Sequence, residues 1–375
     1  MHQTKSTAII YGILHFLVDF CCAFFMFSVS KGPDNCYVGY LIYNFLAFAM
    51  QMPVGLVADR IRKNVYTAVM GCFMILAALI LVCFKSFLGE QAVLWTGLSL
   101  IGLGNCFFHV GGGIEVMKRS QDKAAPLGIF VSPGAIGIFL GTTIGKNANR
   151  WYLFPMILGL GAGIVLLLIK SREYHENSKC KLILEACERN ESRIVEAGDA
   201  CCLKERMLIG FGALFCFFLV VVLRSYLGMI AVFPWKDTLL ESLLALMGVF
   251  AGKLLGGILA DKFGINRTVG WSLMAAAICF FFSDYMFGGV MALFFFNMSM
   301  PVTLFLAGRV LKGNNGFAFG ILTFAIFIGF LPAYAGITFC NRYVLTILAV
   351  LSLVLIEAGI YLQNFSKPHK AGKEF

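Results

Sequence analysis

The segment "GGILADKFGINR", residues 256–267, places an aspartate and a lysine directly after a long apolar run. An earlier segment, "GLVADRIRKN" at residues 55–64, has the same order of glycine, aspartate and base at the end of another apolar run. Asp59 and Asp261 are separated by about half of the chain. Because the same landmark recurs at matching places, the sequence indicates an internal duplication.

Apolar residues dominate the rest of the chain. The 375 residues are 59% hydrophobic and only 13% charged, with a mean hydropathy of +0.84. A water-soluble domain of this length needs far more charge on its surface. A stretch of about 20 apolar residues spans a hydrocarbon core of roughly 30 Å, and such stretches recur along this sequence. The composition therefore predicts an all-α polytopic membrane protein.

Twelve transmembrane helices are predicted, in two pseudo-symmetric six-helix bundles. The N-terminal bundle covers residues 1–170, and the C-terminal bundle with a short tail covers residues 207–375. Residues 171–206 are rich in Glu, Lys and Arg, which predicts a cytoplasmic linker between the bundles. The predicted spans are residues 8–30, 36–58, 65–84, 92–116, 125–146, 151–170, 207–233, 239–260, 267–287, 289–308, 316–339 and 343–362.

The basic residues predict the orientation of these spans. Most of the 30 Lys and Arg fall in the two termini and in the loops on the same side as the termini. The positive-inside rule then places both termini in the cytoplasm, and we expect a bacterial inner membrane. The same asymmetry accounts for the net charge of +10 by attraction to an anionic leaflet. A nucleic-acid partner is therefore not expected.

The thirteen cysteines do not predict disulfides, because most lie in apolar spans or in the linker. A metal site in the linker is an alternative, but no CxxC pair occurs there. We therefore expect no metal and no cofactor. The linker residues of the alternative site are His175, Cys180, Cys187, Cys201 and Cys202.

The paired segments resemble the loop between the second and third helices of the major facilitator superfamily. The signature of that loop is G-x-x-x-D-R/K-x-G-x-R/K-R/K, and the first copy here lacks the central glycine. In that family the loop forms a gate at the cytoplasmic ends of the helices. The resemblance implies the same role for the matching residues, which are Gly55, Asp59, Arg60, Gly257, Asp261, Lys262 and Gly264.

The fifth predicted span contains a GxxxGxxxG stripe made by Gly137, Gly141 and Gly145. Such a stripe lets another helix approach closely, so we expect a helix-packing role. Pro133 predicts a bend, because proline removes one backbone hydrogen bond of a helix. This span loosely resembles the Gly-Pro-rich fifth helix of the proton-driven exporters of the superfamily. Helix packing alone is the alternative explanation.

Five acidic, basic or histidine residues fall well inside the predicted spans, away from their ends, where a charge costs about 2.5–3.5 kcal/mol on insertion scales. His15 and Asp19 lie one turn apart on the same face of the first span. His109, Arg224 and Lys253 lie near the middle of spans four, seven and eight. We expect these groups to face one another or a water-filled cavity.

Two interpretations of these residues are open. In the structural one, Asp19 pairs with Arg224, and His15 only caps Asp19. In the functional one, Asp19 and His15 exchange a proton near neutral pH, while Arg224, Lys253 and His109 bind an anionic or polar substrate. Spans one, four and seven line the central cavity of the major facilitator superfamily, and this implication of the resemblance favours the functional interpretation.

The sequence thus predicts a secondary transporter that exports a small organic anion or drug-like solute by proton-coupled alternating access. Uptake of a small polar metabolite is one alternative, and a non-transporting receptor or scaffold is another. His109 and the Arg224-Ser225 pair loosely resemble the bacterial fosmidomycin-resistance exporters. The expected partners are a small-molecule substrate, protons and the lipid bilayer, and the family implies a monomer. An enzyme is not predicted, because no nucleophile, acid and orienting group converge.

Overall fold

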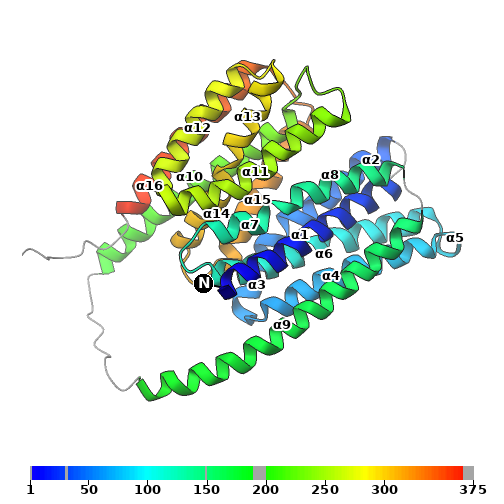
Figure 1. The fold of residues 1–375 in the computed structure, drawn as a ribbon, viewed down its shortest axis with the longest axis horizontal. Helices are drawn as coiled ribbons and strands as arrows, with labels where there is room; N and C mark the ends of the chain where they lie inside the picture. Colours follow the sequence, from blue (N-terminus) through cyan, green and yellow to red (C-terminus); the bar gives the residue numbers. More distant parts are fainter. Residues whose placement is uncertain (1, 30–32, 148–149, 189–199, 366–375) are drawn as a thin grey trace, which may run out of the picture.

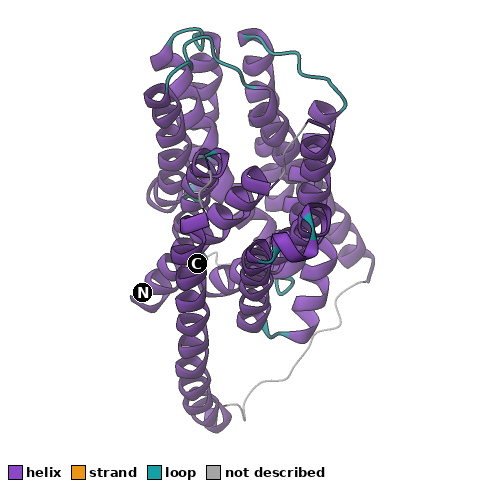
Figure 2. Ribbon diagram, turned by 90° about the vertical axis from the view of Figure 1, so that its right-hand side faces the viewer, coloured by secondary structure: helices purple, strands orange, loops and turns teal. Residues whose placement is uncertain are grey.

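The computed structural model describes residues 2–29, 33–147, 150–188 and 200–365, and these residues form helices and short turns without a strand (Figure 2). Among them, eleven helical segments are long and apolar enough to cross a membrane. A twelfth apolar helix, α12 (Ile265–Phe281), has 17 residues. The twelve segments match the predicted spans to within a few residues. The prediction of an all-α, twelve-helix membrane protein is therefore confirmed.

The first bundle contains α1 to α9, and the second contains α10 to α16 (Figure 1). The first consists of α1 (His2–Val29), α2 (Pro33–Asn44), the π-helical turn η1 (Phe45–Ala49), α3 (Gln51–Ile61), α4 (Asn64–Cys83), α5 (Lys85–Leu88), α6 (Glu90–Arg119), α7 (Ala125–Val131), α8 (Pro133–Lys146), the 3-10 turn η2 (Arg150–Tyr152) and α9 (Leu153–Glu188). The second consists of α10 (Ala200–Ile230), α11 (Leu239–Phe263), α12, α13 (Met286–Asn297), α14 (Ser299–Val310), α15 (Asn315–Tyr334) and α16 (Arg342–Phe365).

Helix α9 continues beyond the sixth span into the predicted linker and ends at Glu188. The side chains of residues 172–206 lie outside the part of the chain that the structure describes. The alternative metal site of His175 and the linker cysteines therefore lies outside it as well.

The fifth span is interrupted at the predicted position. Helix α7 ends at Val131 and α8 begins at Pro133. Because proline has no N–H, the carbonyl of Ile129 loses its usual donor within the helix. This carbonyl lies against α1, where a Cβ added to Gly12 would be only 2.8 Å from the oxygen. The interruption thus brings main-chain oxygen atoms of α7 close to α1.

Helix α8 packs against α1 through the glycine stripe. A Cβ on any of Gly137, Gly141 and Gly145 would crowd a main-chain carbonyl of α1. Because the glycines have no Cβ, the two backbones approach closely enough to fix the face of α1 that includes His15 and Asp19. The carbonyls that face the stripe belong to Phe16, Phe20 and Phe24.

Helix α11 has well-defined signals at both ends. At its start, the N–H of Thr238 donates to Oε2 of Glu241 at 2.7 Å, and the N–H of Glu241 donates to Oγ1 of Thr238 at 3.3 Å. This capping box satisfies two main-chain donors that lack helical partners. At its end, Gly264 adopts a φ of +92°. The helix therefore carries Lys253 near its middle and Asp261 near its last turn.

The two bundles lie at an angle to each other and come together near the N-terminus of the chain (Figure 1). Contacts between them run mainly through two helix pairs, α3 with α15 and α7 with α11. We call the face where α1 begins the N-terminal face. The positive-inside rule predicts that this face is cytoplasmic.

Candidate functional site

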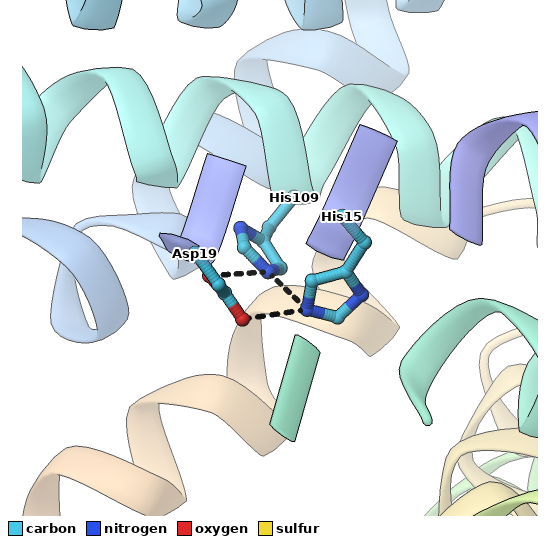
Figure 3. Close-up of side chains that lie close together, drawn as sticks. All are labelled: His15, Asp19 and His109. Carbon is cyan, nitrogen blue, oxygen red and sulfur yellow. Dashed lines mark hydrogen bonds and ion pairs between the residues drawn. The ribbon is translucent and has the colours of Figure 1, made fainter. Parts of the chain in front are cut away.

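His15 and Asp19 of α1 meet His109 of α6 inside the first bundle (Figure 3). Nε2 of His15 lies 3.0 Å from Oδ2 of Asp19 and 2.8 Å from Nε2 of His109. Oδ1 of Asp19 lies 3.7 Å from the same His109 nitrogen. Each of the three residues is only 7% exposed. We call these three residues the His–Asp–His cluster.

The other ring nitrogen of each histidine faces a main-chain carbonyl. Nδ1 of His15 lies 2.8 Å from the oxygen of Phe130, and Nδ1 of His109 lies 2.8 Å from the oxygen of Asn105. A carbonyl only accepts hydrogen bonds, so both Nδ1 atoms carry a hydrogen in these bonds. If both rings were neutral, both Nε2 atoms would be acceptors without a hydrogen, and their lone pairs would repel each other at this distance.

One additional proton converts that repulsion into a hydrogen bond between the two Nε2 atoms. The ring that holds the proton is then an imidazolium, and the carboxylate of Asp19 balances its charge at 3.0–3.7 Å. The geometry therefore fits one imidazolium, one imidazole and one carboxylate, with no net charge in the buried cluster. Loss of the proton leaves the cluster with one negative charge.

Asn105 supports this arrangement from α6. Its Nδ2 donates to Oδ1 of Asp19 at 3.0 Å, and its carbonyl holds His109. The residue is 1% exposed. Sequence reasoning missed Asn105, although its position four residues before His109 puts both side chains on one helical face. Asn105 is a positioning residue.

The start of α8 closes the cluster on another side. A Cβ added to Gly134 would collide with Nε2 of His15 and with Oδ2 of Asp19. Only glycine allows α8 to lie this close. Sequence reasoning predicted a bend at Pro133 and Gly134, but it did not show that Gly134 and the carbonyl of Phe130 meet the cluster, because a single sequence does not show which helix faces the bend.

Among the described residues, the cluster is also the group of His, Cys, Asp or Glu side chains that could hold a metal ion, because its ligand atoms lie within 4.8 Å of one another. Two nitrogens that bind the same tetrahedral zinc ion stand about 3.3 Å apart. The two Nε2 atoms here are 2.8 Å apart, which is a hydrogen-bond distance. The spacing therefore fits a shared proton better than a metal ion.

Arg224 of α10 and Lys253 of α11 lie in the second bundle and are half-buried. Nη1 of Arg224 donates to Oγ1 of Thr303 at 3.3 Å. Among the described side chains, neither cation forms an ion pair with a carboxylate. Lys253 lies within electrostatic range of Arg224 and of Asp19.

These contacts bear on two groupings from the sequence. The Asp19–Arg224 pair of the structural interpretation is not formed, because Asp19 finds its donors within its own bundle. His109, which was predicted to bind substrate with Arg224 and Lys253, contacts His15 in this structure, and its substrate role stays a prediction. The five ionisable residues thus divide into the His–Asp–His cluster in one bundle and two cations in the other that have no ion pair among the described side chains.

Asp59 and Asp261 form two equivalent clamps at the N-terminal face. Each carboxylate accepts two main-chain N–H groups at 2.7–2.9 Å from the first turn of a helix in the other bundle. The first turn of a helix has unpaired N–H groups and a partial positive charge, so a carboxylate is favoured there. Asp59 of α3 accepts from Gly316 and Phe317 of α15, and Asp261 of α11 accepts from Ala124 and Ala125 at the start of α7.

Gly55 and Gly257 lie one turn before the clamp aspartates and allow the helices to touch. A Cβ on Gly55 would collide with the carbonyl of Gly316. A Cβ on Gly257 would lie 2.5 Å from the carbonyl of Ala124. The glycine and the aspartate of each copy of the motif therefore act together on the same partner helix.

The turns after the two aspartates both contain a residue with positive φ, but the two residues differ in ψ, which is 20° at Arg62 and 149° at Gly264. Gly264 has a φ of +92°, and Arg62 at the equivalent place has a φ of +59°. A non-glycine residue with such a positive φ costs about 1–2 kcal/mol, so Arg62 destabilises the turn of the first copy by about this amount. Arg60 and Lys262 are exposed, and neither has an ion pair among the described side chains. The contacts between the two bundles at these turns are therefore made by the aspartates and glycines, not by the basic residues.

No protein-family model matches the sequence, and no curated protein matches it. The structure, by contrast, is similar to solved structures of a major facilitator superfamily transporter. One is a variant of the E. coli fucose:proton symporter FucP, with a TM-score of 0.53 and 14% identity over 96% of this chain and 99% of that chain. Another is FucP in the outward conformation, with the same TM-score and identity over 96% of this chain and 100% of that chain. The chain therefore has the fold of the major facilitator superfamily.

We predict that Asp261→Asn opens the N-terminal face. Asparagine presents an N–H₂ group to one of the two main-chain donors, and the lost charge-assisted bond costs about 1–3 kcal/mol. Since about 1.4 kcal/mol corresponds to a tenfold change in an equilibrium, we expect roughly tenfold faster labelling of an Ala125→Cys reporter by an impermeant maleimide. The label is counted by mass spectrometry of that peptide, so the native cysteines stay in place.

Asp237→Asn is the matched control, because this exposed aspartate lies in the loop before α11, at the opposite end of that helix from the clamp. It should leave the labelling rate unchanged. Equal labelling in the Asp261→Asn variant and the unaltered protein would contradict the clamp.

Proposed function

We propose that this protein is a proton-coupled secondary transporter of a small organic anion that works by alternating access. The observation that carries the proposal is the His–Asp–His cluster, in which each of three ionisable residues is only 7% exposed and the two Nε2 atoms lie 2.8 Å apart in the interior of one bundle. Ionisable residues inside a membrane bundle are costly and are typical of proton relays. The fold shared with the FucP structures supports a transporter over a membrane enzyme.

Arg224 and Lys253 are the proposed anion-binding residues. A half-buried cation without a carboxylate partner is unfavourable, so an anionic group of the substrate stabilises the pair. Lys253 also lies next to the first bundle, since a Cβ on Gly128 of α7 would be 2.8 Å from its carbonyl oxygen. The proposed substrate site therefore adjoins the helix that bonds to the proton cluster.

The signs of the charges predict how the two sites are coupled. The cluster has no net charge with its proton and one negative charge without it. Asp19 is within electrostatic range of Lys253, so the proton-free cluster competes with the substrate anion for this cation. Proton and anion therefore bind best together, which is the behaviour of a symporter and favours uptake.

Export of an anion or drug-like solute remains the second candidate. The observation that favours it is the glycine stripe with Pro133, which resembles the fifth helix of proton-driven exporters. In an exporter, proton and substrate exclude each other, so the two candidates differ in the direction of proton movement during solute flux.

Helix α7 is the proposed link between the proton cluster and the clamp. It is seven residues long, with Phe130 bonded to His15 near one end and Ala125 bonded to Asp261 at the other. Deprotonation leaves two Nε2 lone pairs face to face, so the ring of His15 shifts and its bond to Phe130 changes. A short rigid helix transmits that shift to the clamp.

We expect Asp19→Asn to abolish proton-driven accumulation while solute exchange without a pH gradient continues. The amide cannot change charge, so the cluster no longer couples proton binding to anion binding. The assay follows internal pH and labelled solute in proteoliposomes, with a panel of carboxylates, phosphonates and neutral metabolites. Protons that enter with the solute support symport, and protons that move against it support export.

Asp237→Asn serves again as the charge-matched control and should behave like the unaltered protein. Unchanged proton-driven accumulation by Asp19→Asn would remove Asp19 from the mechanism. Binding of a solute without flux in the unaltered protein would favour the receptor or scaffold alternative.

Arg224→Gln is expected to raise the KM for an anionic substrate by about tenfold or more, because a hydrogen bond to a charged group contributes about 1.5–3 kcal/mol. Arg224→Lys keeps the charge and should recover part of the affinity. The measurement is initial transport rate against substrate concentration for both variants. An unchanged KM in Arg224→Gln would exclude this residue from the substrate site.

A further inference from the structure

A cavity of about 840 Å³ opens at the N-terminal face, away from the residues assigned above to protons and substrate. Its walls come from the end of α6 in the first bundle and from α10, α14 and α16 in the second. Sites for small molecules have volumes of about 300–1,000 Å³. Neither the His–Asp–His cluster nor Arg224 nor Lys253 lines the cavity.

The rim of the cavity is cationic. Lys118 of α6, Arg309 of α14 and Lys312 after α14 line it, and all three side chains are exposed. Asp122 is the one carboxylate among the lining residues that the structure describes, and none of the three cations has an ion pair among the described side chains. The guanidinium of Arg309 lies 5.4 Å from the centroid of the Phe305 ring, which keeps it at the rim. This rim favours a phosphate or another strong anion.

The wall of the cavity is apolar. Met207 and Phe211 of α10 and Phe305 of α14 line it. Met207 begins a membrane-spanning segment, and it is 56% exposed, while Phe211 is 53% exposed. The cavity therefore lies where the headgroups of a bilayer meet its hydrocarbon. A soluble anion leaves this apolar wall uncovered, whereas a lipid covers the wall and the rim together.

We propose that the cavity binds an anionic phospholipid from the leaflet at the N-terminal face. The phosphate lies between Lys118, Arg309 and Lys312, and an acyl chain lies against Phe211 and Phe305. Basic pockets between transmembrane helices suit such headgroups. Lys118 belongs to the first bundle and the other two cations to the second, so one bound lipid joins the bundles on the side where the clamps close. This site is independent of the proposed substrate.

The test compares two variants that lose the same charge on the same face. Lys118→Gln with Lys312→Gln removes two of the three cations at the rim, and Lys63→Gln with Arg267→Gln removes two exposed bases outside the cavity. Each protein is placed in nanodiscs of phosphatidylcholine and phosphatidylglycerol, extracted into detergent, and analysed by native mass spectrometry for retained lipid. We expect at least tenfold less retained phosphatidylglycerol in the cavity variant and no change in the other.

Three results would overturn the proposal. The first is an equal loss in both variants, which indicates diffuse surface attraction. The second is displacement of the lipid by inorganic phosphate or glycerol phosphate, which indicates a site for a soluble anion. The third is loss of lipid in Lys118→Arg with Lys312→Arg, which keeps the charge and should retain the lipid. This conservative variant also controls for a folding defect in the glutamine variant.

Discussion

Two hydrogen bonds to main-chain carbonyls determine the chemistry of the buried cluster. The oxygen atoms of Phe130 and Asn105 fix a hydrogen on Nδ1 of each histidine, so both Nε2 atoms turn toward each other and toward Asp19. Without these carbonyls either ring can place its hydrogen on Nε2, and the two rings then form a hydrogen bond without an added proton. In the proposed mechanism, this geometry makes two histidines and an aspartate into one site for a single proton.

The same helix that supplies the Phe130 carbonyl also donates main-chain hydrogen bonds to Asp261 of the other bundle. Helix α7 is separated from α8 because Pro133 cannot donate a hydrogen bond, and its short length connects the cluster to the clamp at Asp261. The second clamp, at Asp59, has no equivalent cluster beside it among the described residues. The pseudo-symmetry of the fold therefore extends to the clamps, whereas the His–Asp–His cluster lies in one bundle and Arg224 and Lys253 lie in the other.

Much of this arrangement is readable from the sequence, because it depends on short-range spacing. The twelve apolar runs, the repeated aspartates and the one-turn spacing of His15 and Asp19 are all local patterns. The contacts of His109, Asn105 and Gly134 are not local patterns, because they depend on how α6 and α8 are rotated against α1. The Asp19–Arg224 pair of the structural interpretation, which the sequence left open, is not formed for the same reason, since nearer donors on α6 satisfy the carboxylate. Arg62 shows a further limit, because nothing in its residue type predicts a positive φ.

The shared proton is tested most directly by solid-state NMR of protein labelled with ¹⁵N only in histidine, of which the chain has five. His15→Gln and His109→Gln variants assign the two rings. At neutral pH the account predicts a hydrogen on each Nδ1 and a single proton between the two Nε2 nitrogens, visible as a coupling across that hydrogen bond and lost in Asp19→Asn. Two neutral rings without such a coupling would contradict it.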